Sequence, residues 1–160
     1  MFEKTFHFCP VGLAHVSIDG SFIRVNKKLC DFLGYAEKEL TKLTFQELTA
    51  PEYLDEDLDY LENLLKGKID TYSLEKRYIR RDGEYVWAQL TVSLVRDKTN
   101  NPDYFISVVE DIDDKKRIQS ELFQIDALFS KIVSAFSDRT FIWVATPDLG
   151  KMQYVNDGYE

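Results

Sequence analysis

The chain has 160 residues, of which 44% are hydrophobic, and its formal net charge is −8. This length and composition allow one well-buried core. The acidic balance argues against general binding to nucleic acids or anionic membranes, because both need dense patches of lysine and arginine. Apolar runs stay well below the roughly 20 residues that span a bilayer, so no direct membrane insertion is expected.

The N-terminus has no signal-peptide pattern, and the two cysteines, Cys9 and Cys30, form no disulfide framework. Both are expected to be free thiols in a reducing compartment. We therefore expect a cytoplasmic location, and a membrane-attached parent protein would carry its anchor outside these residues.

A β-hairpin is predicted near the N-terminus. Its strands cover residues 13–18 and 21–25, and Asp19-Gly20 is a dipeptide typical of tight turns between strands. Asn26 follows directly, in the position of a helix N-cap. The hairpin should therefore lead straight into a helix.

Four helices are predicted next. The first ends at Gly34, a C-cap glycine, and two short ones follow at 36–43 and 44–48. A longer helix begins at Pro51 and ends at Lys66. Its leucines recur every three or four residues, as on the buried face of an amphipathic helix: Leu54, Leu58, Leu61, Leu64 and Leu65.

Three longer strands follow, at about 72–80, 84–96 and 104–112, and Asp82-Gly83 forms the turn between the first two. Hairpin connections imply an antiparallel sheet. The chain order is then β-β-α-α-α-α-β-β-β, which is an α+β fold.

On the second of these strands, Tyr85, Trp87 and Gln89 alternate onto the face opposite the core. Two interpretations stay open for this face. The N-terminal segment with Phe2 and Phe6 covers it, or it contacts a partner domain.

Charged runs are interpreted as solvated surface. Lys76-Arg77 and Arg80-Arg81 are flanked by acidic residues, and the acidic run at 55–59 lies at a helix start, where the helix dipole stabilises carboxylates. These runs therefore predict no binding site.

Catalytic and metal-binding patterns are not found. The two histidines, His7 and His15, are not spaced as metal ligands, and no Cys-x-x-Cys pair occurs. No nucleophile with a neighbouring base is recognisable. We predict no catalytic residue and no metal site in this chain.

A long amphipathic helix is predicted over residues 113–138. Asp113 and Asp114 at its start suit an N-cap and the positive end of the helix dipole. Its apolar residues follow heptad spacing: Ile118, Leu122, Ile125, Phe129, Ile132 and Phe136. This narrow seam favours a partner helix over packing on the chain's own sheet, so we expect a homodimer with parallel helices.

The opening motif recurs near the end of the chain. Gly20 and Gly150, and likewise Asn26 and Asn156, are 130 residues apart, and each copy reads as a strand, a tight turn and a second strand. The second copy, at 139–160, is too short for a domain. We interpret the chain as part of a longer protein of tandem modules, which is typical of regulatory arrays.

Eight short motifs, in order and spacing, resemble a PAS domain followed by its PAC segment. They are Pro10-Val-Gly-Leu13, Asp19-Gly20, Val25-Asn26, Leu33-Gly34-Tyr35, Glu39-Leu40, Pro51-Glu52, Arg81-Asp82-Gly83 before Trp87, and Glu110-Asp111-Ile112. The resemblance implies a PAS fold, in which a five-stranded antiparallel sheet of order 2-1-5-4-3 carries helices on one face. It divides the chain into a sensory domain at 1–112, a signalling helix at 113–138 and the truncated start of a second PAS domain at 139–160.

The chain departs from the family pattern at Ala50, where a histidine is common, at Tyr53, where an aspartate is common, and at Asp113, where the final motif has threonine. These departures bear on the subfamily rather than on the fold. Asp113 can cap the next helix as threonine would, and with Asp111 it forms the junction to that helix.

The cofactors of this family are not expected here. The resemblance implies that a flavin photosensor needs a cysteine near residues 43–46, where none occurs, and amide side chains at inward positions that here are Tyr78, Ala88 and Val109. A haem sensor commonly takes a histidine from the long helix, and residues 51–66 contain none. Neither flavin nor haem is therefore expected, whereas an unidentified small molecule stays open.

A pocket between the sheet and the helices is the remaining candidate site. Its predicted walls are Phe32, Phe45, Leu61, Tyr78, Ala88, Leu90, Phe105, Ser107 and Val109. These mostly apolar residues either fill the core completely or leave a cavity for an apolar or weakly polar metabolite. Tyr78 and Ser107 would be its polar contacts.

By resemblance, the chain is a non-catalytic sensory and dimerisation module of a bacterial signalling protein. Such modules precede histidine kinase, diguanylate cyclase or phosphodiesterase output domains in the same chain. Changes caused by a ligand or partner would pass through the C-terminal helix. The alternative is a sensor with a defined metabolite in the pocket.

Overall fold

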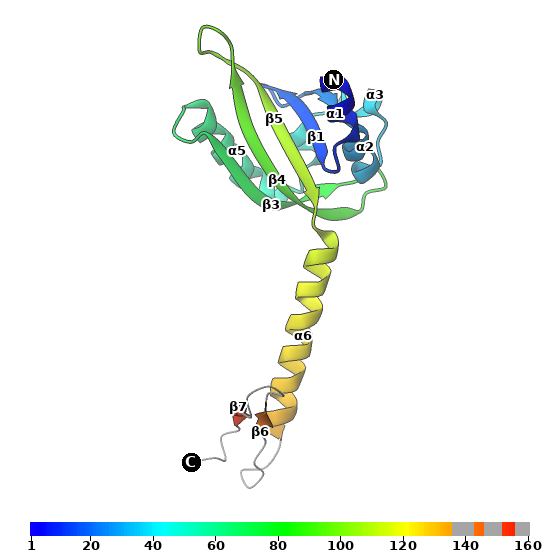
Figure 1. Ribbon diagram of the computed structural model, residues 1–160, viewed down its shortest axis with the longest axis vertical. Coiled ribbons are helices and arrows are strands. Elements are labelled where there is room, and N and C mark those ends of the chain that lie inside the picture. The colour runs from blue at the N-terminus through cyan, green and yellow to red at the C-terminus, as the bar shows by residue number, and fades with distance from the viewer. Residues whose placement is uncertain (136–142, 146–151, 156–160) are drawn as a thin grey trace. The chain divides into compact units, whose positions relative to one another are not determined.

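An antiparallel sheet of five strands, in the order β2-β1-β5-β4-β3, organises the N-terminal part of the chain (Figure 1). The strands are β1 (Gly12–Ser17), β2 (Phe22–Val25), β3 (Thr71–Ile79), β4 (Tyr85–Arg96) and β5 (Pro102–Asp111). The predicted order is confirmed. Because β1 pairs with β5, strands from the two ends of the domain lie side by side, with Ala14 opposite Ser107.

The computed structural model describes residues 1–135, 143–145 and 152–155. The chain divides into two compact units, one at Met1–Asp114 and one at Lys115–Glu160. The first unit contains the whole five-stranded sheet.

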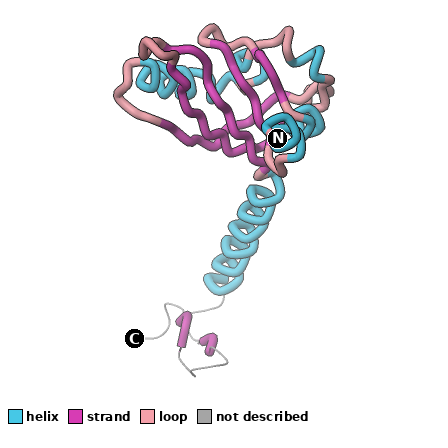
Figure 2. Tube along the Cα trace, turned by 45° about the horizontal axis from the view of Figure 1, so that its top comes forward, coloured by secondary structure: helices cyan, strands magenta, loops and turns pink. Residues whose placement is uncertain are grey.

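Five described helices precede β3 in the chain. They are α1 (Phe2–Phe8), α2 (Lys27–Leu33), α3 (Glu37–Leu40), α4 (Phe45–Leu48) and α5 (Pro51–Leu65). Helices α2 to α5 cover one face of the sheet (Figure 2). Alternate strand residues point into the layer between them, so that Tyr72, Leu74, Val86 and Leu90 are buried there.

The helix α1 was not predicted. Its Phe6 is only 4% exposed and lies against the His15 ring, with a centroid distance of 5.3 Å. The Arg24 guanidinium lies 4.5 Å from the centre of the Phe6 ring. Phe6 therefore covers β1 and β2. On β4, the ring of Trp87 contacts Tyr53 of α5, edge-on and with 5.6 Å between ring centroids.

Asn26 connects three elements from a fully buried position. Its Oδ1 accepts hydrogen bonds from the backbone N–H groups of Leu13 (2.9 Å) and Leu29 (3.0 Å). Its Nδ2 donates to the carbonyl oxygens of Phe6 and Val11, both at 3.0 Å. The predicted cap of α2 is confirmed, and the same side chain also ties α1 and β1 to that helix.

The second unit holds most of helix α6 (Asp113–Ala135) and a strand pair, β6 (Trp143–Ala145) with β7 (Met152–Val155). The two strands are antiparallel, and Trp143 lies opposite Val155. A hairpin at this place agrees with the repeated motif. The intervening turn and Phe136 lie outside the described residues, so the second module remains a prediction.

The start of α6 is attached to β4. The N–H of Ile112 donates to the carbonyl of Trp87 (3.1 Å), and the N–H of Trp87 donates to Asp113 Oδ1 (3.1 Å). Asp111 Oδ1 accepts from the N–H of Asp113 at 3.0 Å. Asp111 therefore accepts from the first backbone N–H of α6, while the side chain of Asp113 bonds to the sheet.

We predict that Asn26→Ala lowers the free energy of unfolding by about 3 kcal/mol or more, because it removes a helix cap and leaves several buried backbone groups unpaired. Urea denaturation of both proteins would measure the difference. Asn63→Ala is the control, since Asn63 is half-buried in α5 and alanine favours a helix. A loss below about 1 kcal/mol for Asn26→Ala would contradict the prediction.

Candidate functional site

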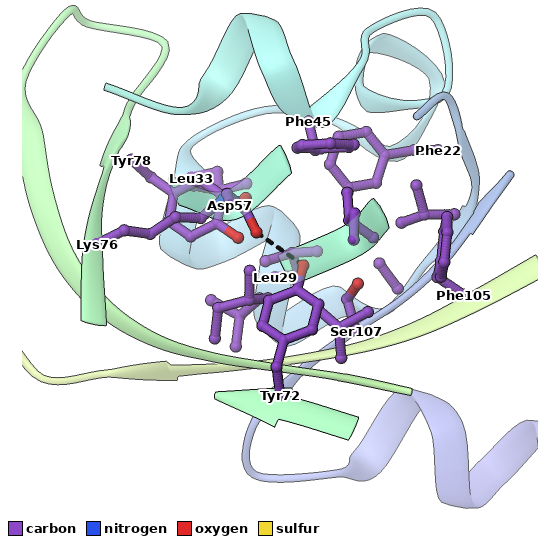
Figure 3. Close-up of a pocket in the computed structure, with 16 residues that line it drawn as sticks. Phe22, Leu29, Leu33, Phe45, Asp57, Tyr72, Lys76, Tyr78, Phe105 and Ser107 are labelled. Carbon is purple, nitrogen blue, oxygen red and sulfur yellow. Dashed lines mark hydrogen bonds and ion pairs between the residues drawn. The ribbon is translucent and has the colours of Figure 1, made fainter. Parts of the chain in front are cut away.

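A pocket lies between the inner face of the sheet and the helices (Figure 3). Most of the predicted wall residues line it: Phe45, Leu61, Tyr78, Leu90, Phe105, Ser107 and Val109. Phe32 and Ala88 are buried in the core but do not line this pocket. The lining also includes three polar residues that were not predicted there, Asp57, Tyr72 and Lys76.

Asp57 and Lys76 form a buried ion pair. Lys76 Nζ lies 2.6 Å from Asp57 Oδ2, and neither residue has measurable solvent exposure. Lys76 also donates to Thr49 Oγ1 at 2.8 Å. The Tyr72 hydroxyl, which points toward Asp57 in Figure 3, donates to Oδ1 at 2.7 Å. The pair therefore joins α5 to β3.

Two aromatic rings complete the surroundings of the ammonium group. Lys76 Nζ lies 4.5 Å from the centre of the Tyr78 ring and 5.5 Å from that of Phe45. A desolvated cation over an aromatic face is stabilised by about 2 kcal/mol. These contacts offset part of the large cost of removing the charge from water.

Burial changes the protonation of the groups around the pair. Burial lowers the pKa of Lys76, and the Asp57 carboxylate opposes that shift. Burial, followed by the nearby charge of Asp57, raises the pKa of Tyr72 and of Tyr78 above the usual tyrosine value. Both tyrosines therefore keep their protons at neutral pH and can act as hydrogen-bond donors.

The interpretation of Lys76 and the 55–59 run as solvated surface was wrong for Lys76 and Asp57. Two signals in the sequence pointed to burial. Lys76 continues the alternation of inward residues on β3, and Asp57 lies four and seven residues before the buried Leu61 and Leu64 on α5. A charged residue on each of two buried faces, with opposite signs, is the pattern of an internal ion pair.

The space left in the pocket is small. The cavity has a volume of about 20 Å³, which slightly exceeds the roughly 10–15 Å³ that one water molecule needs. Ser107 and Tyr78, the two residues predicted as its polar contacts, both line it. Nearly all of the predicted volume is therefore filled by side chains.

The residues do not fit the cofactors of related sensors. Tyr78, Ala88 and Val109 are buried, as expected, and offer no amide group to a flavin edge. A cavity of about 20 Å³ is also far below the roughly 300 Å³ of typical cofactor pockets. Among the described residues, no cluster of three His, Cys, Asp or Glu side chains could hold a metal ion.

A cluster of large side chains lies on the opposite face of the sheet. The Arg77 guanidinium is 5.0 Å from the ring centre of Tyr85 and 5.8 Å from that of Trp87, and it pairs with Glu52.

None of the described helices is long and apolar enough to cross a bilayer.

The strand order and the helical layer over one face define the class of protein. A family profile described as PAS fold matches residues 22–109. The chain belongs to the PAS fold family. A solved PAS domain of a protein from Colwellia psychrerythraea superposes with a TM-score of 0.66 at 15% identity, covering 71% of this chain and 95% of that one.

Two curated relatives contain a similar segment. The probable diguanylate cyclase DgcE of Escherichia coli (strain K12) is 48% identical over 118 residues, which are 74% of this chain and 11% of that protein. The sensor histidine kinase TmoS of Ectopseudomonas mendocina is 28% identical over 114 residues, which are 71% of this chain and 12% of that protein. The chain thus spans about a tenth of these relatives and is homologous to a PAS sensory domain within them.

We predict that Asp57→Asn and Lys76→Met each lower the free energy of unfolding by about 3–5 kcal/mol, because each leaves one buried charge uncompensated. The double variant should lose less than either single variant, since no unpaired charge remains. Urea denaturation of the four proteins gives the coupling energy.

The pair Glu52–Arg77 is the matched control. It joins the same helix and strand, but both side chains are partly exposed, so Glu52→Gln should change stability by about 1 kcal/mol or less. Additive losses in the Asp57 and Lys76 double variant would show that the two residues do not act as a pair.

Proposed function

We propose that the chain is a non-catalytic sensory and dimerisation module of a multidomain bacterial signal-transduction protein. It would comprise a PAS domain with its PAC segment, a signalling helix and the start of a second PAS module, in the cytoplasm. The output domain, a histidine kinase or a cyclic-di-GMP enzyme, would lie elsewhere in the same protein. The similarity to segments of DgcE and TmoS supports this assignment.

The observation that carries the proposal is the apolar seam of α6. The described seam residues are large and between 41% and 64% exposed: Ile118, Leu122, Ile125, Phe129 and Ile132. Burying each of them against a partner would contribute roughly 1.5–3 kcal/mol. Their heptad spacing fits a second helix of the same kind, so a second copy of this chain is the proposed partner.

The junction supports a route from the PAS domain to that helix. Asp113 and Ile112 are hydrogen-bonded to the backbone of Trp87 on β4. The inner neighbours of Trp87 on this strand face the core. A change in the sheet would therefore move the first turn of α6, and dimer packing would pass the change onward.

The second candidate function is a metabolite sensor. The position of Ser107 in the lining of the core pocket, among mostly apolar side chains, favours it. A hydroxyl can both donate and accept a hydrogen bond, so it could contact a polar group of a molecule in the pocket. Native mass spectrometry of the purified chain would detect a retained ligand.

We predict that the chain is a homodimer with parallel helices, and that Leu122→Glu with Ile125→Glu yields monomers, because like charges then meet in the seam. Size-exclusion chromatography with light scattering measures the mass, and circular dichroism checks that the PAS domain stays folded. Phe123→Glu is the control. Phe123 is 77% exposed on the same helix but lies outside the seam, so the dimer should persist. A wild-type monomer would exclude dimerisation through α6.

A further inference from the structure

Helix α1 lies beside β1 (Figure 1) and is held by a small number of contacts. It has seven residues and no side-chain cap at its N-terminus, and helices this short are not stable by themselves. Phe6, which is 4% exposed, packs against the sheet. Glu3 pairs with Arg24 of β2, and the Phe6 carbonyl accepts from Asn26. A change in any of these contacts can therefore shift the position of α1.

His15 lies beneath the main contact of α1. It occupies a half-buried position of β1, on the face of the sheet opposite the core pocket. Its ring is 5.3 Å from the Phe6 ring of α1 and 5.0 Å from the Tyr104 ring of β5. Arg24 is directly opposite His15 on β2, and its guanidinium lies 4.5 Å from the centre of the Phe6 ring. The imidazole is therefore enclosed by α1 and two strands.

A proton on His15 is unfavourable in these surroundings. Charged or titratable side chains face it from all three elements: Arg24 from β2, Glu3 and His7 from α1, and Tyr104 from β5. Glu3 is the one carboxylate among these, and it already pairs with Arg24. The rings of Phe6 and Tyr104 are tilted by 55° and 44° to the imidazole, so neither gives the stacked contact that would favour a charged ring. Burial and the charge of Arg24 accordingly lower the pKa of His15.

We propose that protonation of His15 releases α1 from the sheet, so that the N-terminal segment responds to pH. Release takes Phe6 away from His15 and lets the imidazole and Arg24 reach water, where two neighbouring cations repel each other less. The Asn26 amide loses the Phe6 carbonyl but keeps that of Val11. This role depends neither on a ligand in the core pocket nor on the proposed dimer.

The sign of the response follows from the lowered pKa of His15. Because the released form binds the proton more tightly than the docked form, protons favour release. The docked form has its full advantage above about pH 6.5, the ordinary pKa of a histidine. It loses this advantage as the pH falls below that value. Release would uncover the part of the sheet face that carries His15 and Tyr104.

Hydrogen exchange of the α1 amides in the full chain tests the proposal. Protection factors, which correct for the intrinsic effect of pH on exchange, are measured at about pH 7.5 and about pH 5.5. Protection of residues 2–8 should fall at least about threefold at the lower pH, while the amides of β4 keep theirs. His15→Gln, which cannot take up the proton, should remove this dependence. His7→Gln is the matched control, because His7 lies on α1 and pairs with Glu3, and it should leave the dependence in place.

The coupling must also act in the reverse direction, so loosening α1 should raise the pKa of His15. Phe6→Ala removes the ring that covers the imidazole. An NMR titration of the His15 ring proton should then show its pKa moving up toward the ordinary histidine value. Phe8→Ala is the control, because Phe8 is 84% exposed, and it should leave the titration unchanged. If Phe6→Ala does not fold, the exchange comparison with His15→Gln decides alone.

Three results would overturn the inference. The first is equal protection of α1 at the two pH values in the wild-type chain, and the second is a pH dependence that survives in His15→Gln. The third is an equal loss of protection in α1 and β4, which would show unfolding of the whole domain by acid. A chain that is monomeric or retains no ligand would count against the proposed function and leave this inference standing.

Discussion

The ion pair between Asp57 and Lys76 governs the arrangement of the helical layer on the sheet. Two opposite charges without solvent exposure are tolerated only at a separation and orientation that satisfy both, because either one alone in an apolar core is strongly destabilising. The pair therefore fixes the position of α5 over β3 more narrowly than apolar packing, which accepts several registers. The hydrogen bonds from Tyr72 and to Thr49 extend this constraint to the segment before α5.

The sheet order and most elements could be predicted from the sequence because their signals are local. Asp19-Gly20 and Asp82-Gly83 mark hairpins, Asn26 marks a helix start, and alternation identifies the inward residues of β4. The boundaries of α3 differ most, since the expected helix at 36–43 is Glu37–Leu40 in the structure. Short helices of this kind depend on tertiary contacts, and their ends are weakly encoded.

The pocket was predicted less completely because its polar part depends on two residues far apart in the chain. Asp57 and Lys76 each look like ordinary surface charges beside their charged neighbours. Only their places on the inward faces of α5 and β3, taken together, indicate a pair. The helix α1 was missed for a similar reason. Its few residues have no strong period, and contacts of Phe6 with His15 and Arg24 hold it in place.

The hydrogen bonds of Asn26 determine where this domain can be cut. The family profile begins at residue 22, yet the amide of Asn26 is bonded to the carbonyls of Phe6 and Val11. An expression fragment that started at the profile boundary would lack both acceptors and β1, an interior strand of the sheet. The cooperative folding unit therefore includes α1, and sequence insertions or fusion joints between α1 and β2 would have to preserve the spacing that lets one side chain reach all three elements.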